Sequence, residues 1–179
     1  MSLDERWENI DELLTRSSRT QDEKLANASQ QIAELRFKFP TKEHPAYRTH
    51  VNIPTVTMTV QVGRDTLAPD IVTVEKLSTE ETRLVMTAAV VNAEQVTEAE
   101  GKASWSRYAA IPDQAFYLYV PVGYGAPAKK ICRGLKIRVE GFRTYRTTPR
   151  GFEINDVSEA PNPLSALMPP IVRKLLATP

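Results

Sequence analysis

Two apolar runs that follow each other closely, over residues 68–93, constrain the fold of this chain more than any other feature. The first reads A-P-D-I-V-T-V-E-K and the second R-L-V-M-T-A-A-V-V-N-A, with a short polar turn between them. A third run, A-F-Y-L-Y-V-P at Ala115–Pro121, is apolar at nearly every position, which is typical of a strand buried on both faces. We therefore expect a mixed sheet built on these runs, with Asp70 at the start of its second strand.

The segment before these runs predicts one more strand. Residues 51–62 alternate between apolar side chains and Thr or Gln, and this period of two indicates a half-buried strand. Pro54 is compatible with it only near the strand start or on a sheet edge. Residues 40–50 read as a loop.

Helix signals follow the second run. Thr97 and Glu100 have the spacing of a capping box, which predicts a helix that continues to about Ala110. Pro127 suits the first turn of a further short helix, and Gly134 suits the residue just after its end. Beyond it, residues 135–147 and 151–157 predict a closing hairpin turned at T-P-R-G.

We divide the 179 residues into a helical arm (1–39), an α/β domain (40–158) and a proline-rich tail with a short helix (159–179). Apolar residues recur three and four apart along the arm, which predicts two helices. Such stripes suit either an antiparallel pair packed on the domain or an arm that forms a homodimer. The tail in turn either lies over the domain or docks on a partner.

Composition excludes several classes of function. A net charge of +1 gives no overall attraction to nucleic acid or to an anionic membrane, so such binding would need a local patch. The single Cys132 excludes an internal disulfide and a cysteine-rich zinc site. The chain has neither a secretory signal at its start nor a run of about 20 apolar residues, so we expect a cytoplasmic protein without a membrane partner.

The order helix, three strands, helix, strand resembles the core of the restriction-endonuclease-like proteins, the PD-(D/E)XK superfamily. Pro69-Asp70 looks like the family's "PD" at the start of the second strand. The stretch V-V-N-A-E-Q-V-T-E-A-E-G-K-A-S-W looks like the third strand running into the family's helix, and A-F-Y-L-Y-V-P like the buried strand after it. The likeness covers roughly residues 34–157 and implies a mixed central sheet flanked by helices.

The resemblance also implies a metal site. Nucleases of this family hold Mg²⁺ with an Asp from strand two and an acid from strand three, followed two residues later by a Lys that positions the attacking water. In this sequence the last two positions fall near Ala89 and Val91, which are apolar and leave Asp70 alone. A shifted alignment offers Glu94 as the second acid.

In that shifted alignment, Lys102 would act as the positioning base and Glu34 as a further metal ligand. The rearranged catalytic set is then Asp70, Glu94 and Lys102, with Mg²⁺ as the cofactor. Asp70 also has a plainer interpretation as a strand-opening residue that caps a local turn.

A group of basic residues near the C-terminal hairpin is the candidate nucleic-acid surface. Its members are Lys129, Lys130, Arg133, Arg143 and Arg146, and aromatic residues lie between them. The alternative is a solvated face balanced by acids elsewhere.

Three hypotheses follow. The first is a divergent PD-(D/E)XK protein that is catalytically impaired and acts by nucleic-acid or protein binding. The second is an active Mg²⁺-dependent DNA endonuclease with a rearranged site. The third is a structural, partner-binding protein that dimerises through its helical arm.

Overall fold

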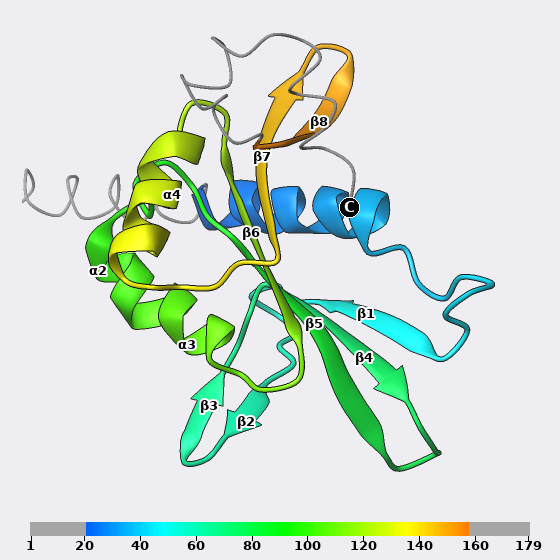
Figure 1. The fold of residues 1–179 in the computed structure, drawn as a ribbon. Helices are drawn as coiled ribbons and strands as arrows, with labels where there is room; N and C mark the ends of the chain where they lie inside the picture. Colours follow the sequence, from blue (N-terminus) through cyan, green and yellow to red (C-terminus); the bar gives the residue numbers. More distant parts are fainter. Residues whose placement is uncertain (1–20, 158–179) are drawn as a thin grey trace, which may run out of the picture.

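The computed structural model describes residues 21–157, which form a mixed α+β fold around a curled six-stranded sheet (Figure 1). In spatial order, the strands of this sheet are β1 (Tyr47–Val51), β4 (Ile71–Lys76), β5 (Thr82–Val90), β6 (Ala115–Pro121), β7 (Gly141–Thr148) and β8 (Gly151–Asp156). A separate two-stranded sheet pairs β2 (Val60–Val62) with β3 (Asp65–Leu67).

Strand directions divide the large sheet into two parts. β1, β4 and β5 form an antiparallel meander, in which Ile71 lies opposite Ala88. β5, β6 and β7 run parallel to one another, and β8 returns antiparallel to β7. Parallel neighbours need a crossover connection, which helices supply at both places.

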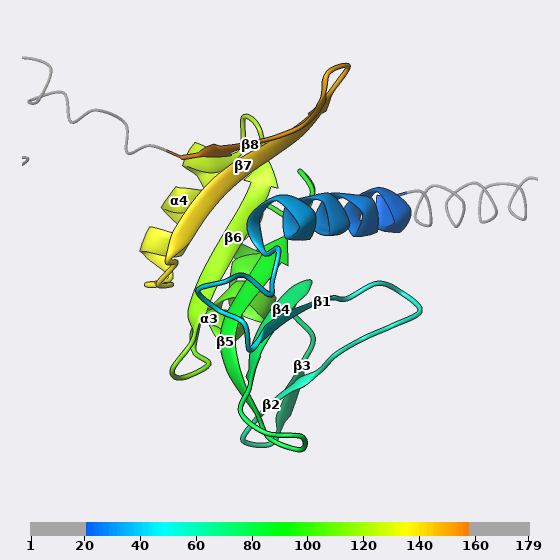
Figure 2. The same ribbon diagram turned by 90° about the vertical axis from the view of Figure 1, so that its right-hand side faces the viewer.

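Helices cover both faces of the sheet. A continuous helical segment joins β5 to β6, and α4 (Gly125–Gly134) joins β6 to β7 on the same face. A helix over residues 21–36 lies across the opposite face (Figure 2). No helix within residues 21–157 is both long and apolar enough to cross a bilayer.

The face that carries the crossover helices, which we call the closed face, has its core around Trp105. This side chain is fully buried and packs with Ala89, Val91, Leu118 and Cys132. Burial also raises the pKa of the Cys132 thiol to about 11, so it stays protonated at neutral pH. The apolar β5 and β6 sequences thus reflect strands that are covered on both sides.

The other face, which we call the arm face, is covered by the helix of residues 21–36. Ile32 is fully buried, and Ala28 and Ala33 beside it contact a cluster that includes Ile71 and Tyr119. Of the two helices predicted for the arm, this is the second, and it packs on the sheet. The first lies outside the described residues, as does the predicted tail.

Several predicted elements are confirmed. The second and third strands lie side by side, and the Ala115–Pro121 strand has the predicted bounds. The closing hairpin forms at the predicted T-P-R-G turn, where Gly151 adopts a φ of 126° that favours glycine.

The predicted strand over residues 51–62 is wrong. Strand β1 instead occupies the end of the segment predicted as a loop and takes in Val51. Of the remaining alternating stretch, only Val60–Val62 forms a strand, and Ile53 and Val56 form an isolated bridge. The side chain of Asn52 accounts for the break, because it hydrogen-bonds the backbone N–H and C=O of Met58 and the C=O of Pro69. Pro54 also lacks the N–H that a strand ladder would use.

The helical segment after β5 begins as predicted. The Thr97 hydroxyl accepts a hydrogen bond from the Glu100 N–H at 3.2 Å, as in a capping box. Three consecutive pieces follow: α2 (Glu98–Glu100), a π-helical stretch (Gly101–Trp105) and α3 (Ser106–Ala109). Gly101 permits close packing there, because a Cβ atom at this position would lie 2.8 Å from the Ile131 side chain.

The end of α4 differs in detail from its prediction. Gly134 is the last helical residue rather than the residue after the end, and Leu135 forms the cap. The left-handed residue that follows is Lys136, with a φ of 56°.

Candidate functional site

Asp70 lies immediately before β4, at the end of the sheet where this strand begins. Its backbone C=O accepts a hydrogen bond from the Asn52 N–H at 2.8 Å, which fixes the strand entry. Its carboxylate oxygen Oδ2 accepts a hydrogen bond from the Val90 N–H of β5, also at 2.8 Å. Because side chains alternate along a strand and Ile71 faces the arm, Asp70 projects toward the closed face.

The environment of Asp70 disfavours its charge. Burial raises the pKa of this carboxyl to about 6, and the negative charge of Glu100 adds to the increase. The hydrogen bond from Val90 acts in the opposite direction, because it stabilises the ionised form. A substantial fraction of Asp70 is therefore protonated at mildly acidic pH.

Hydrocarbon occupies the strand next to Asp70. Ala89 and Val91, the positions where the family resemblance expects an acid and a lysine, are both buried and pack in the Trp105 cluster. At positions 89 and 91 the third strand thus brings no side-chain oxygen ligand to the face that Asp70 shares with it, and the Thr87 hydroxyl on the same face donates to Gln114.

The structure does not gather the other predicted site residues around Asp70. Glu94 accepts a 3.3 Å hydrogen bond from Gln21, and Lys102 forms a 2.8 Å ion pair with the exposed Glu98. Glu34 is exposed on the helix of residues 21–36. Within residues 21–157, no three His, Cys, Asp or Glu side chains are grouped so that they could hold a metal ion.

Three residues near Asp70 were not predicted as part of a site. Glu100 is close enough for its charge to raise the Asp70 pKa, and Asp70 in turn raises the pKa of Tyr108 and Tyr145, each to about 12, with burial as the larger cause. The sequence carried a signal only for Glu100. It is the third residue of a helix that starts just after β5, and this places it near the carboxyl end of that strand.

Both tyrosines use their hydroxyls to fasten the backbone at this edge. Tyr108 donates to the Ala68 C=O at 3.2 Å, and Tyr145 donates to the Val91 C=O at 2.8 Å. The Tyr108 hydroxyl thereby ties the segment just before Asp70 to α3 on the closed face. The Tyr145 hydroxyl ties the end of β5 to β7.

The predicted basic surface is divided by ion pairs. Arg143 contacts Asp156 at 2.6 Å and stacks over Tyr117, and Arg146 pairs with Glu153 at 2.7 Å. Lys129 donates a hydrogen bond to the Val157 C=O.

The other basic residues of this region are exposed on α4 and on the loop after it. They are Lys130, Arg133, Lys136 and Arg138.

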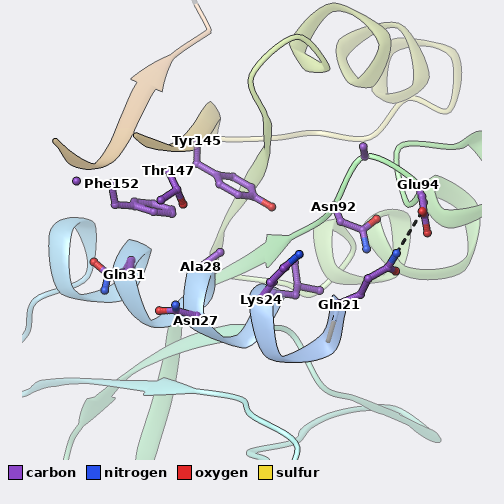
Figure 3. A pocket seen from close by; sticks show the side chains of 13 residues that line it. Gln21, Lys24, Asn27, Ala28, Gln31, Asn92, Glu94, Tyr145, Thr147 and Phe152 are labelled. Atoms are coloured by element: carbon purple, nitrogen blue, oxygen red, sulfur yellow. Dashed lines mark hydrogen bonds between the residues drawn. The ribbon is translucent and has the colours of Figure 1, made fainter. Parts of the chain in front are cut away.

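A groove of about 750 Å³ opens on the arm face, between the helix of residues 21–36 and the β7–β8 hairpin (Figure 3). The helix lines it with Gln21, Lys24, Leu25, Asn27, Ala28 and Gln31. No interaction of Lys24 with another residue is found in the part of the chain that the structure describes. The helix wall is therefore rich in amides and carries one positive charge.

The opposite wall of the groove is aromatic. Tyr145 and Phe152 stack with their ring centroids 5.7 Å apart and their planes 16° apart. Figure 3 shows both rings facing the helix across the opening, with Asn92 and Glu94 at one end. This groove was not predicted from the sequence. A usable signal was the polar set at 24, 27 and 31, whose spacing places these residues on one helix face.

Comparisons with protein-family models, with curated proteins and with solved structures find no match for this chain.

Proposed function

We propose that this chain is a divergent relative of the restriction-endonuclease-like proteins that has lost its metal site and acts by binding nucleic acid. The observation that carries the proposal is the strand beside Asp70. It presents Ala89 and Val91, both buried, where a family nuclease would present an acid and a lysine.

The order of elements supports the relationship. In the large sheet, a helix is followed by three antiparallel strands, a crossover helix and a strand parallel to the third, as in the family core, and the small β2–β3 sheet is inserted between the first and second of these strands. Asp70 stands at the start of the second strand, where the family's metal-binding Asp would be.

The chemistry of Asp70 supports the loss of catalysis. Mg²⁺ retains its waters unless several oxygen ligands converge, and a single carboxylate holds it poorly. The carboxylate oxygen Oδ2 already accepts the Val90 N–H, so part of its bonding capacity serves the sheet. This arrangement suits a residue that fastens two strands.

Exposed cations support nucleic acid as the ligand. Lys130 and Arg133 are exposed on α4, and Lys136 and Arg138 on the loop that follows it. Such side chains attract a phosphate backbone, although the ion pairs of Arg143 and Arg146 make this surface smaller than the sequence suggested.

The test measures fluorescence anisotropy of labelled single-stranded and duplex DNA and RNA with the full chain, first in EDTA and then in Mg²⁺ or Mn²⁺. We expect binding of the same strength in both conditions and intact nucleic acid on a gel. Replacing Lys130 and Arg133 with Ala should weaken binding and reduce its salt dependence, whereas Lys102→Ala, which removes a cation already paired with Glu98, should change little. Absence of binding to every nucleic acid would overturn the proposal.

One observation favours a second candidate, the active Mg²⁺-dependent endonuclease. Glu100 is a second acid near Asp70, and its charge contributes to the raised pKa there. In this candidate Asp70 and Glu100 would share the ion. Cleavage of plasmid or single-stranded DNA that requires Mg²⁺ or Mn²⁺ and disappears in Asp70→Ala would establish it and remove the first proposal.

A homodimer through the N-terminal helices is the third candidate. The exposed Leu35 of the described helix is one apolar side chain that a second copy could cover. Light scattering on the full chain and on a chain without the first 20 residues tests it, and a monomer in both would exclude it.

A further inference from the structure

The groove on the arm face has the composition of a site for a planar, neutral, hydrogen-bonding group. Its volume of about 750 Å³ lies in the range of pockets that hold small ligands. Its two walls differ in chemistry, since one is a stacked aromatic pair and the other carries amide side chains. We infer that the groove holds an unpaired nucleobase, with Tyr145 and Phe152 as the stacking wall and Asn27 and Gln31 reading its edge.

The aromatic wall is held in place by the sheet. Tyr145 is anchored because its hydroxyl donates to the Val91 C=O at 2.8 Å. Phe152 stacks on Tyr145 from the paired strand β8. A preformed aromatic surface of this kind can stack on any base.

The helix wall supplies the complementary groups. Asparagine and glutamine each present a donor and an acceptor, which is the pattern that the edge of a nucleobase also presents. Asn27 and Gln31 lie one helical turn apart and both line the groove. Their side chains form no hydrogen bond with another residue of the described part of the chain, so they are free to bind a ligand.

Charge favours a base that carries a phosphate. Lys24 lies on the same wall, one turn from Asn27, and offers a cation beside the amides. The one acid of the groove, Glu94, lies at the end near Gln21, which donates to it at 3.3 Å. A phosphate near Lys24 would therefore meet no acid on that part of the helix wall.

This inference rests on the proposed function, because it names the part of the nucleic acid that the protein reads. A nucleobase with its phosphate can come from a single strand or from a free nucleotide. A paired base is hidden inside the duplex and cannot enter the groove, so single strands should bind more tightly than duplexes.

The experiment compares four forms of the full chain by fluorescence anisotropy with a labelled single-stranded oligonucleotide. They are the natural sequence, the double variant Asn27→Ala/Gln31→Ala, Phe152→Leu, and the control Gln30→Ala. Gln30 is exposed on the same helix and does not line the groove. Phe152→Leu keeps an apolar side chain but removes one of the two rings of the stacking wall. Circular dichroism on each variant establishes that it is folded.

We expect the double variant and Phe152→Leu each to weaken binding about ten-fold, and Gln30→Ala to leave it unchanged. A duplex of the same sequence should bind at least about ten-fold more weakly than the single strand. Competition with nucleoside monophosphates identifies the source. If a nucleoside monophosphate displaces the labelled strand at a lower concentration than the unlabelled oligonucleotide does, the natural ligand is a free nucleotide. If the monophosphate needs the higher concentration, the natural ligand is a strand.

Equal affinities for the natural chain and both groove variants would overturn the inference and leave the proposed function standing. Equal affinities for duplex and single strand would do the same. Absence of binding by the natural chain would instead remove the proposed function, so the two failures are distinguishable.

Discussion

The two faces of the large sheet differ in whether a sequence motif coincides with an open binding site. The closed face carries the only motif-like residue, Asp70, yet hydrocarbon and helices cover the strand beside it. The arm face carries no recognisable motif, yet the one helix that covers it within residues 21–157 leaves an open groove with amide side chains and an aromatic wall.

The difference comes from how many helices cover each face. Crossovers between parallel strands place the α2–α3 segment and α4 on the closed face, where they fill the surface around Trp105. In the described part of the chain, the arm face receives only the helix of residues 21–36. This helix packs on the strands near Ile71, and a groove remains between it and the β7–β8 hairpin, although Tyr145 and Phe152 pack against the same apolar cluster. Coverage, rather than the location of an acid, therefore decides where a ligand can enter.

The largest expected effect is on the closed face. Trp105→Ala removes a fully buried side chain from the centre of the core, and we expect it to lower the free energy of unfolding by about 3–5 kcal/mol. Urea denaturation followed by circular dichroism measures this. A loss below about 1 kcal/mol would mean that the closed face is not packed as described.

A smaller effect, dependent on pH, is expected at Asp70. Its folded-state pKa of about 6 exceeds the ordinary aspartate pKa of 3.8, so the folded protein binds more protons than the unfolded chain between these values. Stability contributed by protonated Asp70 is present at low pH and is lost as the pH rises through about 6. Asp70→Asn, which keeps an acceptor for the Val90 N–H, should remove this dependence.

The matching measurement is the free energy of unfolding of both proteins across the acidic range. Relative to the natural chain, Asp70→Asn should gain on the order of 2 kcal/mol as the pH rises from about 4 to about 7. A difference between the two proteins that is constant with pH, or that changes in the opposite direction, contradicts the half-buried carboxyl with a raised pKa described for this site.

The smallest effect is expected on the arm face. Asn27 is exposed in the groove and forms no hydrogen bond within the described residues, so Asn27→Ala should change the free energy of unfolding by less than about 0.5 kcal/mol. The same urea denaturation measures it. A loss of several times that size would show that Asn27 supports the fold, which would remove the contrast between the two faces.

Most of the sheet could be predicted from sequence because its central strands carry strong local signals. Continuous apolar runs gave β5 and β6, and the Thr97–Glu100 spacing gave the start of the crossover helix. The strand prediction for residues 51–62 failed because alternating apolar and polar side chains form a half-buried strand only when the backbone can pair. The Asn52 side chain and Pro54 prevent that pairing.

The candidate sites were harder to predict because they depend on contacts between distant segments. The approach of Glu100 to Asp70 follows from the packing of the crossover helix on β5, and the groove follows from the spacing between a helix and a hairpin more than 100 residues apart. The neutralisation of Arg143 by Asp156 likewise depends on the register of β7 with β8. No single segment carries a pattern that encodes these distances.

Among residues 21–157, Asp70 lacks the partners to hold a divalent ion. Manganese broadens the amide NMR signals of residues close to it, so titration of the labelled chain with Mn²⁺ near neutral pH tests the claim most directly. We predict no selective broadening at Asp70, Val90 or Glu100. Saturable broadening of these signals that disappears in Asp70→Asn would contradict it.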